Sequence, residues 1–135
     1  MTKILGISGS LRERSYNTAL LLATPEYNRG TSGVLKNAID WLSRPALASV
    51  LRWKPVAIVG ASSGRGGTRR AQQQVRDALL FPGAVVLEEP QVALPIAWER
   101  FDPDLNLTDE NAGAALTELL TGLVALTHEH HPVAA

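Results

Sequence analysis

Cysteine is absent from this sequence of 135 residues, and its absence excludes several kinds of chemistry. Without a thiol, the chain forms no disulfide, offers no thiolate nucleophile and holds no metal through cysteine. An excess of charge of one sign is also missing, because 13 lysines and arginines balance 13 aspartates and glutamates. A net charge of zero gives no indication of a nucleic-acid or membrane partner recognised through bulk charge.

Long hydrophobic runs are missing as well. The apolar run over residues 3–7 is too short for a signal peptide or a membrane span, so we expect a cytoplasmic protein with no membrane partner. Hydrophobic residues still make up 45% of the chain, the usual share in a globular protein that buries a core. We therefore expect residues 1–135 to form one domain, with residues 128–135 as a frayed tail.

Short apolar runs alternate along the chain with segments of helical periodicity. The runs predict buried parallel strands over 3–8, 20–24, 55–61 and 84–87, and an extended piece in "QVALP". A period of 3.6 residues predicts helices over 33–43, 68–81 and 108–127, and Ser15 is placed to cap a further helix over 15–20. This alternation predicts an α/β fold, with a mostly parallel sheet and helices on its faces.

Three polar loops follow predicted strands and lead into predicted helices, over residues 8–15, 24–33 and 61–68. Because the carboxyl ends of parallel strands share one edge of a sheet, we expect these loops to converge there and bind a ligand. The first loop, "SGSLRERSYN", offers hydroxyls, the Arg12 guanidinium and backbone N–H groups at a helix start. This set suits an anion such as phosphate, although an ordinary polar turn before a capped helix also explains it. The loop is not a triphosphate loop, because no Gly-Lys-Ser/Thr follows, and its glycine spacing excludes a dinucleotide fingerprint.

The other two loops suit a flat heteroaromatic ligand. In "TPEYNRG", Pro25 stiffens the turn, Tyr27 supplies a flat face, and the Asn28 amide both donates and accepts hydrogen bonds. Taken alone, this segment also reads as a plain turn. The third loop, "ASSGRGGTRR", combines hydroxyls and the Arg65 cation with several glycines, so it either closes over a ring or a second anion or is a disordered glycine loop.

Four segments carry a family resemblance when they are taken together, in the order "KILGISGSLRERSYN", "ATPEYNRG" with "GVLKNAIDWLSRP", "KPVAIVGASSGRGGTRRAQ" and "FDPDLNLTDE". They resemble the NADPH-dependent FMN reductases, a family that includes quinone, azo-dye and chromate reductases. The resemblance implies a flavodoxin-like fold with a parallel sheet in the order 2-1-3-4-5, and a homodimer or tetramer. It also implies FMN as cofactor and NADPH or NADH as co-substrate.

The resemblance assigns residues to the cofactor. It implies that the FMN phosphate is bound by Ser10, Arg12, Ser15, Tyr16 and Asn17. It implies that the isoalloxazine ring is lined by Pro25, Glu26, Tyr27 and Asn28 and touched by Ser62, Ser63 and Gly64, while Arg65 meets the nicotinamide nucleotide. The chemistry would then be a hydride transfer from NAD(P)H through FMN to free flavin, a quinone or a similar acceptor. No protein residue acts as acid or nucleophile, because FMN carries the chemistry.

Compared with the family, this chain lacks the segment between the first helix and the strand over 20–24, which would hold strand 2 and its flanking helices. The expected fold is therefore a shortened flavodoxin-like sheet of about four strands. Eleven residues separate Ser8 from Leu20, whereas a parallel crossover needs a dozen or more. A helix over 15–19 rises only about 7 Å, and a five-residue strand is about 17 Å long.

Three hypotheses resolve this short connection. In the first, the strand over 3–8 pairs with the sheet of a second copy and gives an intertwined homodimer. In the second, residues 17–24 are repurposed and the phosphate site is damaged. In the third, a segment of the natural chain is missing from this sequence. The alternative function is a non-catalytic module that binds flavin or another phosphate ligand, or only oligomerises.

Several side chains have expected structural roles. Thr31 and Ser32 stand where the family often has Ile-Pro and are expected to loosen the helix start, and Thr108 is expected to cap the last helix. Glu26 suits a loop-fixing carboxylate better than a general base. The remaining expectations are no metal site in "HEHH", core or interface positions for the tryptophans, and a solvated face or subunit contact for Arg69, Arg70 and Arg76.

Overall fold

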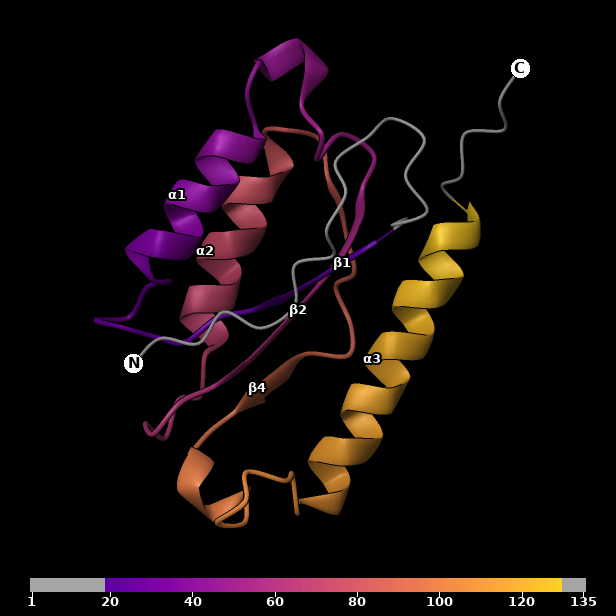
Figure 1. The fold of residues 1–135 in the computed structure, drawn as a ribbon. Helices are drawn as coiled ribbons and strands as arrows, with labels where there is room; N and C mark the ends of the chain where they lie inside the picture. Colours follow the sequence, from indigo (N-terminus) through magenta and orange to yellow (C-terminus); the bar gives the residue numbers. More distant parts are fainter. Residues whose placement is uncertain (1–18, 130–135) are drawn as a thin grey trace.

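The computed structural model describes residues 19–129 and shows strands alternating with helices, as predicted (Figure 1). The strands are β1 (Leu20–Ala23), β2 (Pro55–Ala61), β3 (Val85–Val86) and β4 (Val92–Leu94). The helices are α1 (Gly33–Leu42), α2 (Arg69–Leu80) and α3 (Glu110–Glu129), with short 3₁₀ helices η1 (Ala46–Ala48) and η2 (Ala97–Glu99). The predicted strand over 3–8 and the phosphate loop lie outside the described residues.

The four described strands are parallel and occupy three positions in one sheet, with β2 at the centre. Val56 pairs with Leu20 of β1 and with Val86 of β3, while Val59 pairs with Ala23 of β1 and with Val92 of β4. Both β3 and β4 therefore lie along the edge of β2 that is opposite to β1. They are two halves of one interrupted strand, which is why "QVALP" continues the run over 84–87.

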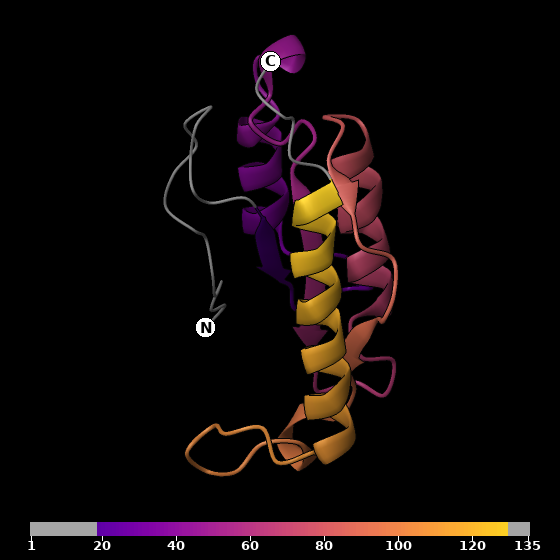
Figure 2. The same cartoon turned by 90° about the vertical axis from the view of Figure 1, so that its right-hand side faces the viewer.

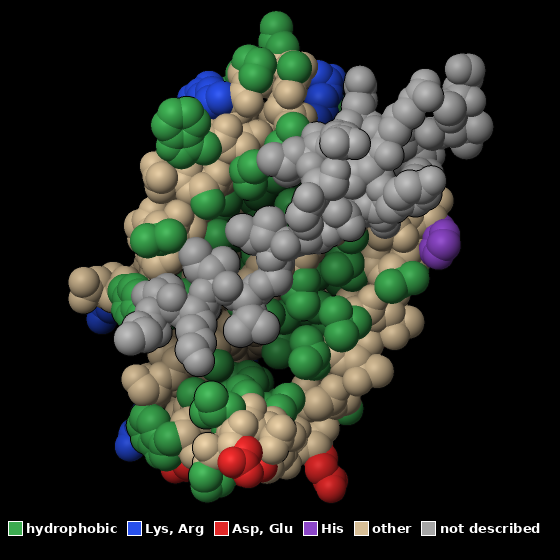
Figure 3. Space-filling view, in the orientation of Figure 1, with side chains coloured by type: hydrophobic (Ala, Val, Ile, Leu, Met, Phe, Trp, Pro, Cys, Tyr) green, Lys and Arg blue, Asp and Glu red, His purple; other side chains and the backbone are tan. Residues whose placement is uncertain are grey.

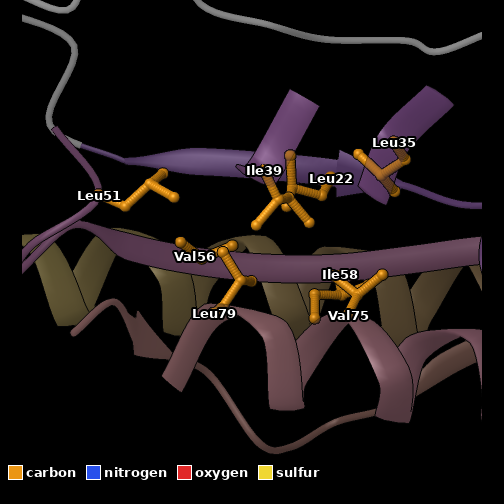
Figure 4. Close-up of a cluster of buried hydrophobic side chains, with 8 residues drawn as sticks. All are labelled: Leu22, Leu35, Ile39, Leu51, Val56, Ile58, Val75 and Leu79. Atoms are coloured by element: carbon orange, nitrogen blue, oxygen red, sulfur yellow. The ribbon is translucent and has the colours of Figure 1, made fainter. Parts of the chain in front are cut away.

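Helices cover the two faces of the sheet, with α1 and α2 on one face and α3 on the other (Figures 1 and 2). Successive β2 residues point to opposite faces, so Val56 and Ile58 join the cluster under α1 and α2, whereas Ala57 packs toward α3. Figure 4 shows the first cluster, in which β1 and β2 side chains meet residues of both helices, including Leu35, Ile39, Val75 and Leu79. The core therefore fixes β1, β2 and α2 relative to one another.

Two helix starts differ from expectation. The Ser32 hydroxyl accepts a hydrogen bond from the Leu35 N–H at 3.2 Å, so Ser32 caps α1 and strengthens the helix start instead of loosening it. α3 is capped by Asp109, whose carboxylate accepts from the Ala112 N–H at 2.9 Å. Thr108 instead donates its backbone N–H to the Arg100 carbonyl. α3 also continues to Glu129, so the expected frayed tail begins no earlier than residue 130.

Some side chains expected in the core lie at the surface. Trp41, Trp53 and Trp98 are each at least 60% exposed, which excludes a core position for them and leaves an interface role as a prediction. On α3, the helical period predicts that Leu120 and Val124 are buried beside Leu119 and Leu123, but only Leu119 and Leu123 are buried, while Leu120 and Val124 are exposed. Figure 3 shows hydrophobic side chains gathered along the side of α3 that faces the sheet. No helix within residues 19–129 is long and apolar enough to cross a membrane.

Candidate functional site

Two of the three predicted ligand loops meet at the carboxyl ends of β1 and β2, as the sheet topology requires. The Thr24 N–H donates to the Val59 carbonyl at 2.9 Å, which continues the β1–β2 pairing into the loop. A Cβ on Gly60 would lie 2.2 Å from the Thr24 carbonyl oxygen and 2.4 Å from the Thr68 hydroxyl. Only glycine therefore allows the two strand ends to come this close. The first loop lies outside the described residues.

The second loop is a tight turn that presents polar and aromatic groups to solvent. Tyr27 and Gly30 exchange two backbone hydrogen bonds of 2.9 Å, and the Asn28 and Arg29 between them have φ values of 49° and 65°. Two successive positive φ values are those of a type I′ turn, in which asparagine is favoured. The turn leaves Tyr27 half exposed and Asn28 exposed, so both side chains lie at the surface of this sheet edge.

The second loop is tied to the start of α2. The Glu26 carboxylate accepts hydrogen bonds from the backbone N–H groups of Arg70 and Ala71, at 3.1 and 3.2 Å. The Gln74 side-chain oxygen accepts from the Thr31 N–H at 2.7 Å. Thr68, at the N-cap position of α2, makes no capping bond of its own. Glu26 therefore has the expected loop-fixing role and supplies the cap that α2 otherwise lacks.

The third loop is held against the end of β4, so it is not the disordered glycine loop of the alternative interpretation. The Ser62 hydroxyl accepts from the Gly64 N–H at 3.1 Å, and the Ser62 N–H donates to the Leu94 carbonyl at 2.9 Å. Gly67 has a φ of +61°, and a Cβ there would lie 2.4 Å from the Ala93 carbonyl oxygen. The backbone of this loop is fixed, while Ser63, Gly64 and Arg65 remain exposed.

A cleft of about 350 Å³ lies between the two loops and the end of β4. Its charged lining consists of Glu26, Arg65, Arg69 and Arg70, and its other lining residues include Gly66, Ala93 and Pro95. Glu26 and Arg65 were predicted as ligand residues, whereas Arg69 and Arg70 were expected to form a solvated face or a subunit contact. The missed signal is the position of two arginines in the first turn of a helix, where cations are unfavourable.

The predicted ligand residues are therefore only partly placed. At the carboxyl edge of the sheet the structure brings together Pro25, Glu26, Tyr27 and Asn28 with Ser62, Ser63, Gly64 and Arg65. The predicted phosphate ligands, Ser10, Arg12, Ser15, Tyr16 and Asn17, lie outside the described residues. The donor set at this edge fits the ring half of FMN, because it offers a flat aromatic face, an amide and exposed backbone groups. No group of His, Asp or Glu side chains in the described ranges is arranged to hold a metal ion.

Comparisons with known proteins place this fold and site in a family. The sequence model of the NADPH-dependent FMN reductase family matches residues 18–99, which include both described loops. An NAD(P)H-dependent FMN reductase of Pseudomonas aeruginosa is 47% identical over 105 residues, covering 78% of this chain and 56% of that protein. A 2-hydroxy-1,4-benzoquinone reductase of a Burkholderia species is 42% identical over 92 residues, covering 68% of this chain and 50% of that protein.

A solved structure shows the same architecture. The flavoenzyme NAD(P)H:acceptor oxidoreductase from Paracoccus denitrificans superposes with a TM-score of 0.74 at 34% identity, covering 84% of this chain and 62% of that one. The chain spans about half the length of the curated relatives it matches. It has a shortened flavodoxin-like fold, and it belongs to the NADPH-dependent FMN reductase family.

Proposed function

We propose that this chain binds FMN at the loops that follow β1 and β2, and that it reduces free flavin, a quinone or a similar acceptor with NADPH or NADH. The observation that carries the proposal is the arrangement of these two loops. Gly60 brings the strand ends together, Glu26 fixes the second loop to α2, and Tyr27 and Asn28 are left exposed beside them. Relatives named as FMN and quinone reductases support the same reaction class.

Each proposed ring ligand has a task that its position supports. Tyr27 offers its ring face and Asn28 its amide to the isoalloxazine, and the exposed Ser63 offers its hydroxyl to the polar ring edge. Ser10, Arg12, Ser15, Tyr16 and Asn17 are the proposed phosphate ligands. When bound, FMN supplies the redox chemistry by accepting a hydride from the nicotinamide and passing electrons to the acceptor. The role of the chain itself is to bind FMN and the nicotinamide nucleotide and to orient them.

The alternative function is a flavin- or phosphate-binding module without turnover. The two functions differ in one step. The reductase and a flavin-binding module both predict a yellow protein, but only the reductase loses its flavin absorbance when NADPH or NADH is added.

An absorbance titration with FMN tests the proposal. We expect saturable binding at one FMN per chain and bleaching of the bound flavin by NADPH or NADH without oxygen. Asn28→Gly removes the amide but keeps the left-handed backbone, and we expect it to weaken FMN binding about tenfold. The control is Asn37→Ala, which removes an exposed amide from α1 and leaves binding unchanged. A protein that takes up no FMN contradicts both the reductase and the flavin-binding module, and unbleached bound flavin supports the flavin-binding module.

We also infer that the chain works in the cytoplasm, where NAD(P)H is available, and that it forms a homo-oligomer. A ridge of apolar side chains on α1 and in η1 supports this inference. Val34 and Trp41, seven residues apart and thus on one face of α1, are 63% and 75% exposed, and Leu47 is 89% exposed. We call these three side chains the α1 ridge. A second copy would cover them, and light scattering of the purified chain measures the assembly mass.

A further inference from the structure

The cleft beside the third loop holds more positive charge than the fold needs. Arg65, Arg69 and Arg70 line it and are exposed. The ion pairs within residues 19–129 are Lys36–Asp40 and Arg100–Asp109, so none of the three cleft arginines is paired there. The carboxylate in the cleft is that of Glu26. Three cations and one carboxylate leave an excess of two positive charges in a single concave site.

Two of these arginines stand where they oppose the electrostatics of the helix. Arg69 and Arg70 are the first two residues of α2, and its first turn contains no acidic residue. The N-terminus of a helix carries a partial positive charge, so cations there destabilise the helix and anions stabilise it. Arg69 and Arg70 lower the stability of the helix and line a cleft, and positive charges kept in a cleft at such a cost indicate that the cleft binds an anion. Arg76, about two helical turns after Arg69 on the same helix, does not line the cleft.

The anion that fits this cleft is not a second helix cap. Glu26 already accepts hydrogen bonds from the N–H groups of Arg70 and Ala71. A ligand anion therefore meets guanidinium groups, whose planar N–H forks match the oxygens of phosphate. The excess of two positive charges matches one phosphate monoester, which carries a charge near −2 at neutral pH. A volume of about 350 Å³ admits that group with part of a sugar.

We propose that Arg65, Arg69 and Arg70 bind a phosphate monoester dianion, and that this group is the 2′-phosphate of NADPH. This inference rests on the proposed function, which brings a nicotinamide nucleotide to the same sheet edge. The third loop connects the two sites, because Ser62, Ser63 and Gly64 are the proposed ring contacts and Arg65, the next residue, lines the cleft. The cleft thereby selects NADPH over NADH, which lacks the phosphate.

Calorimetry with ligand fragments tests the proposal independently of flavin. Adenosine 2′,5′-bisphosphate carries the distinguishing phosphate, adenosine 5′-monophosphate lacks it, and inorganic phosphate represents a free phosphate ligand. We expect the bisphosphate to bind at least about tenfold more tightly than either. Arg69→Gln and Arg70→Gln are each expected to remove about tenfold of this affinity. Arg52→Gln, at an exposed arginine stacked on Trp53 outside the cleft, is expected to leave it unchanged.

Thermal unfolding of the same variants separates binding from structure. Because Arg69 and Arg70 oppose the helix dipole, their glutamine variants are expected to unfold at the same temperature or higher. A lower midpoint would make these arginines structural and overturn the proposal. The proposal is also overturned if the bisphosphate and the monophosphate bind with equal affinity, or if neither binds. If inorganic phosphate binds as tightly as the bisphosphate, the assignment of the site to NADPH is overturned. If the chain binds no FMN but binds the bisphosphate through these arginines, the proposed function fails while the phosphate site stands.

Discussion

At the scale of single residues, Gly60 determines how closely the two described ligand loops can lie. It is in β2, one residue before the strand ends, and its backbone faces the Thr24 carbonyl of the neighbouring loop. The contacts on both sides are inflexible, because one is backbone and the other is the buried side chain of Thr68. Any side chain at position 60 must therefore push β1 and α2 away from β2.

Gly60→Ala is expected to lower the free energy of unfolding by about 3 kcal/mol, because a methyl group 2.2 Å from a carbonyl oxygen forces the backbone to move. Urea denaturation followed by circular dichroism measures this change. The control is Gly113→Ala, where no atom lies within 4 Å of the new Cβ. Inside α3 that change is expected to raise stability by about 0.5 kcal/mol. Equal stability of Gly60→Ala and the unchanged chain would refute the close approach.

At the scale of elements, α3 begins with a cap that the sequence pattern placed one residue too early. Asp109 accepts the Ala112 N–H, and Arg100 donates to the same carboxylate. These bonds, the Ala112 backbone bond foremost, lower the pKa of Asp109 below its usual value of 3.8. A carboxyl whose pKa is lower in the folded state stabilises the fold when it is ionised. That stabilisation is complete above pH 3.8 and disappears as the pH falls through the folded-state pKa.

Asp109→Ala is therefore expected to lower the thermal unfolding midpoint by a few degrees at pH 7. The difference from the unchanged chain should shrink as the pH falls below 3.8, because the unchanged chain then loses the same interaction. Thermal melts between pH 7 and pH 2 measure both curves. The control is Asp104→Ala, an exposed aspartate of the same connection, whose curve should follow that of the unchanged chain. A difference that stays constant with pH would contradict the capping role.

Periodicity was enough to predict the strands and α-helices of residues 19–129, but not the two 3₁₀ helices or the contacts between elements. The runs over 20–24 and 55–61 became β1 and β2 because continuous apolar residues suit a strand buried on both faces. The capping of α2 by the Glu26 carboxylate was not predictable, because Glu26 lies 44 residues before Arg70, whose N–H donates the hydrogen bond. The cleft was missed for the same reason, because Ala93 and Pro95 join the arginines only through the pairing of β4 with β2.

At the scale of the whole molecule, the described sheet is asymmetric in its cover. α1 and α2 lie side by side on one face, whereas α3 contacts β2 and β4 on the other. Within residues 19–129, β1 pairs with β2 alone and is an edge strand. The sequence could not predict how the chain connects to this edge, because eleven residues between Ser8 and Leu20 allow several paths. The intertwined dimer therefore stays a hypothesis.

A homo-oligomer makes the stability of this chain depend on its own concentration, because association stabilises only the folded state. If the α1 ridge is the contact between copies, a hundredfold higher protein concentration should raise the thermal unfolding midpoint. Trp41→Glu should abolish that rise, because it places a charge in an apolar contact. The matched control is Trp98→Glu, the same change at a tryptophan that is 65% exposed, in η2 at the opposite end of the molecule from η1 (Figure 1). We expect this control to keep the concentration dependence and the assembly mass of the unchanged chain. A midpoint independent of concentration, together with a monomer mass in light scattering, would exclude the second copy and leave the α1 ridge exposed to solvent.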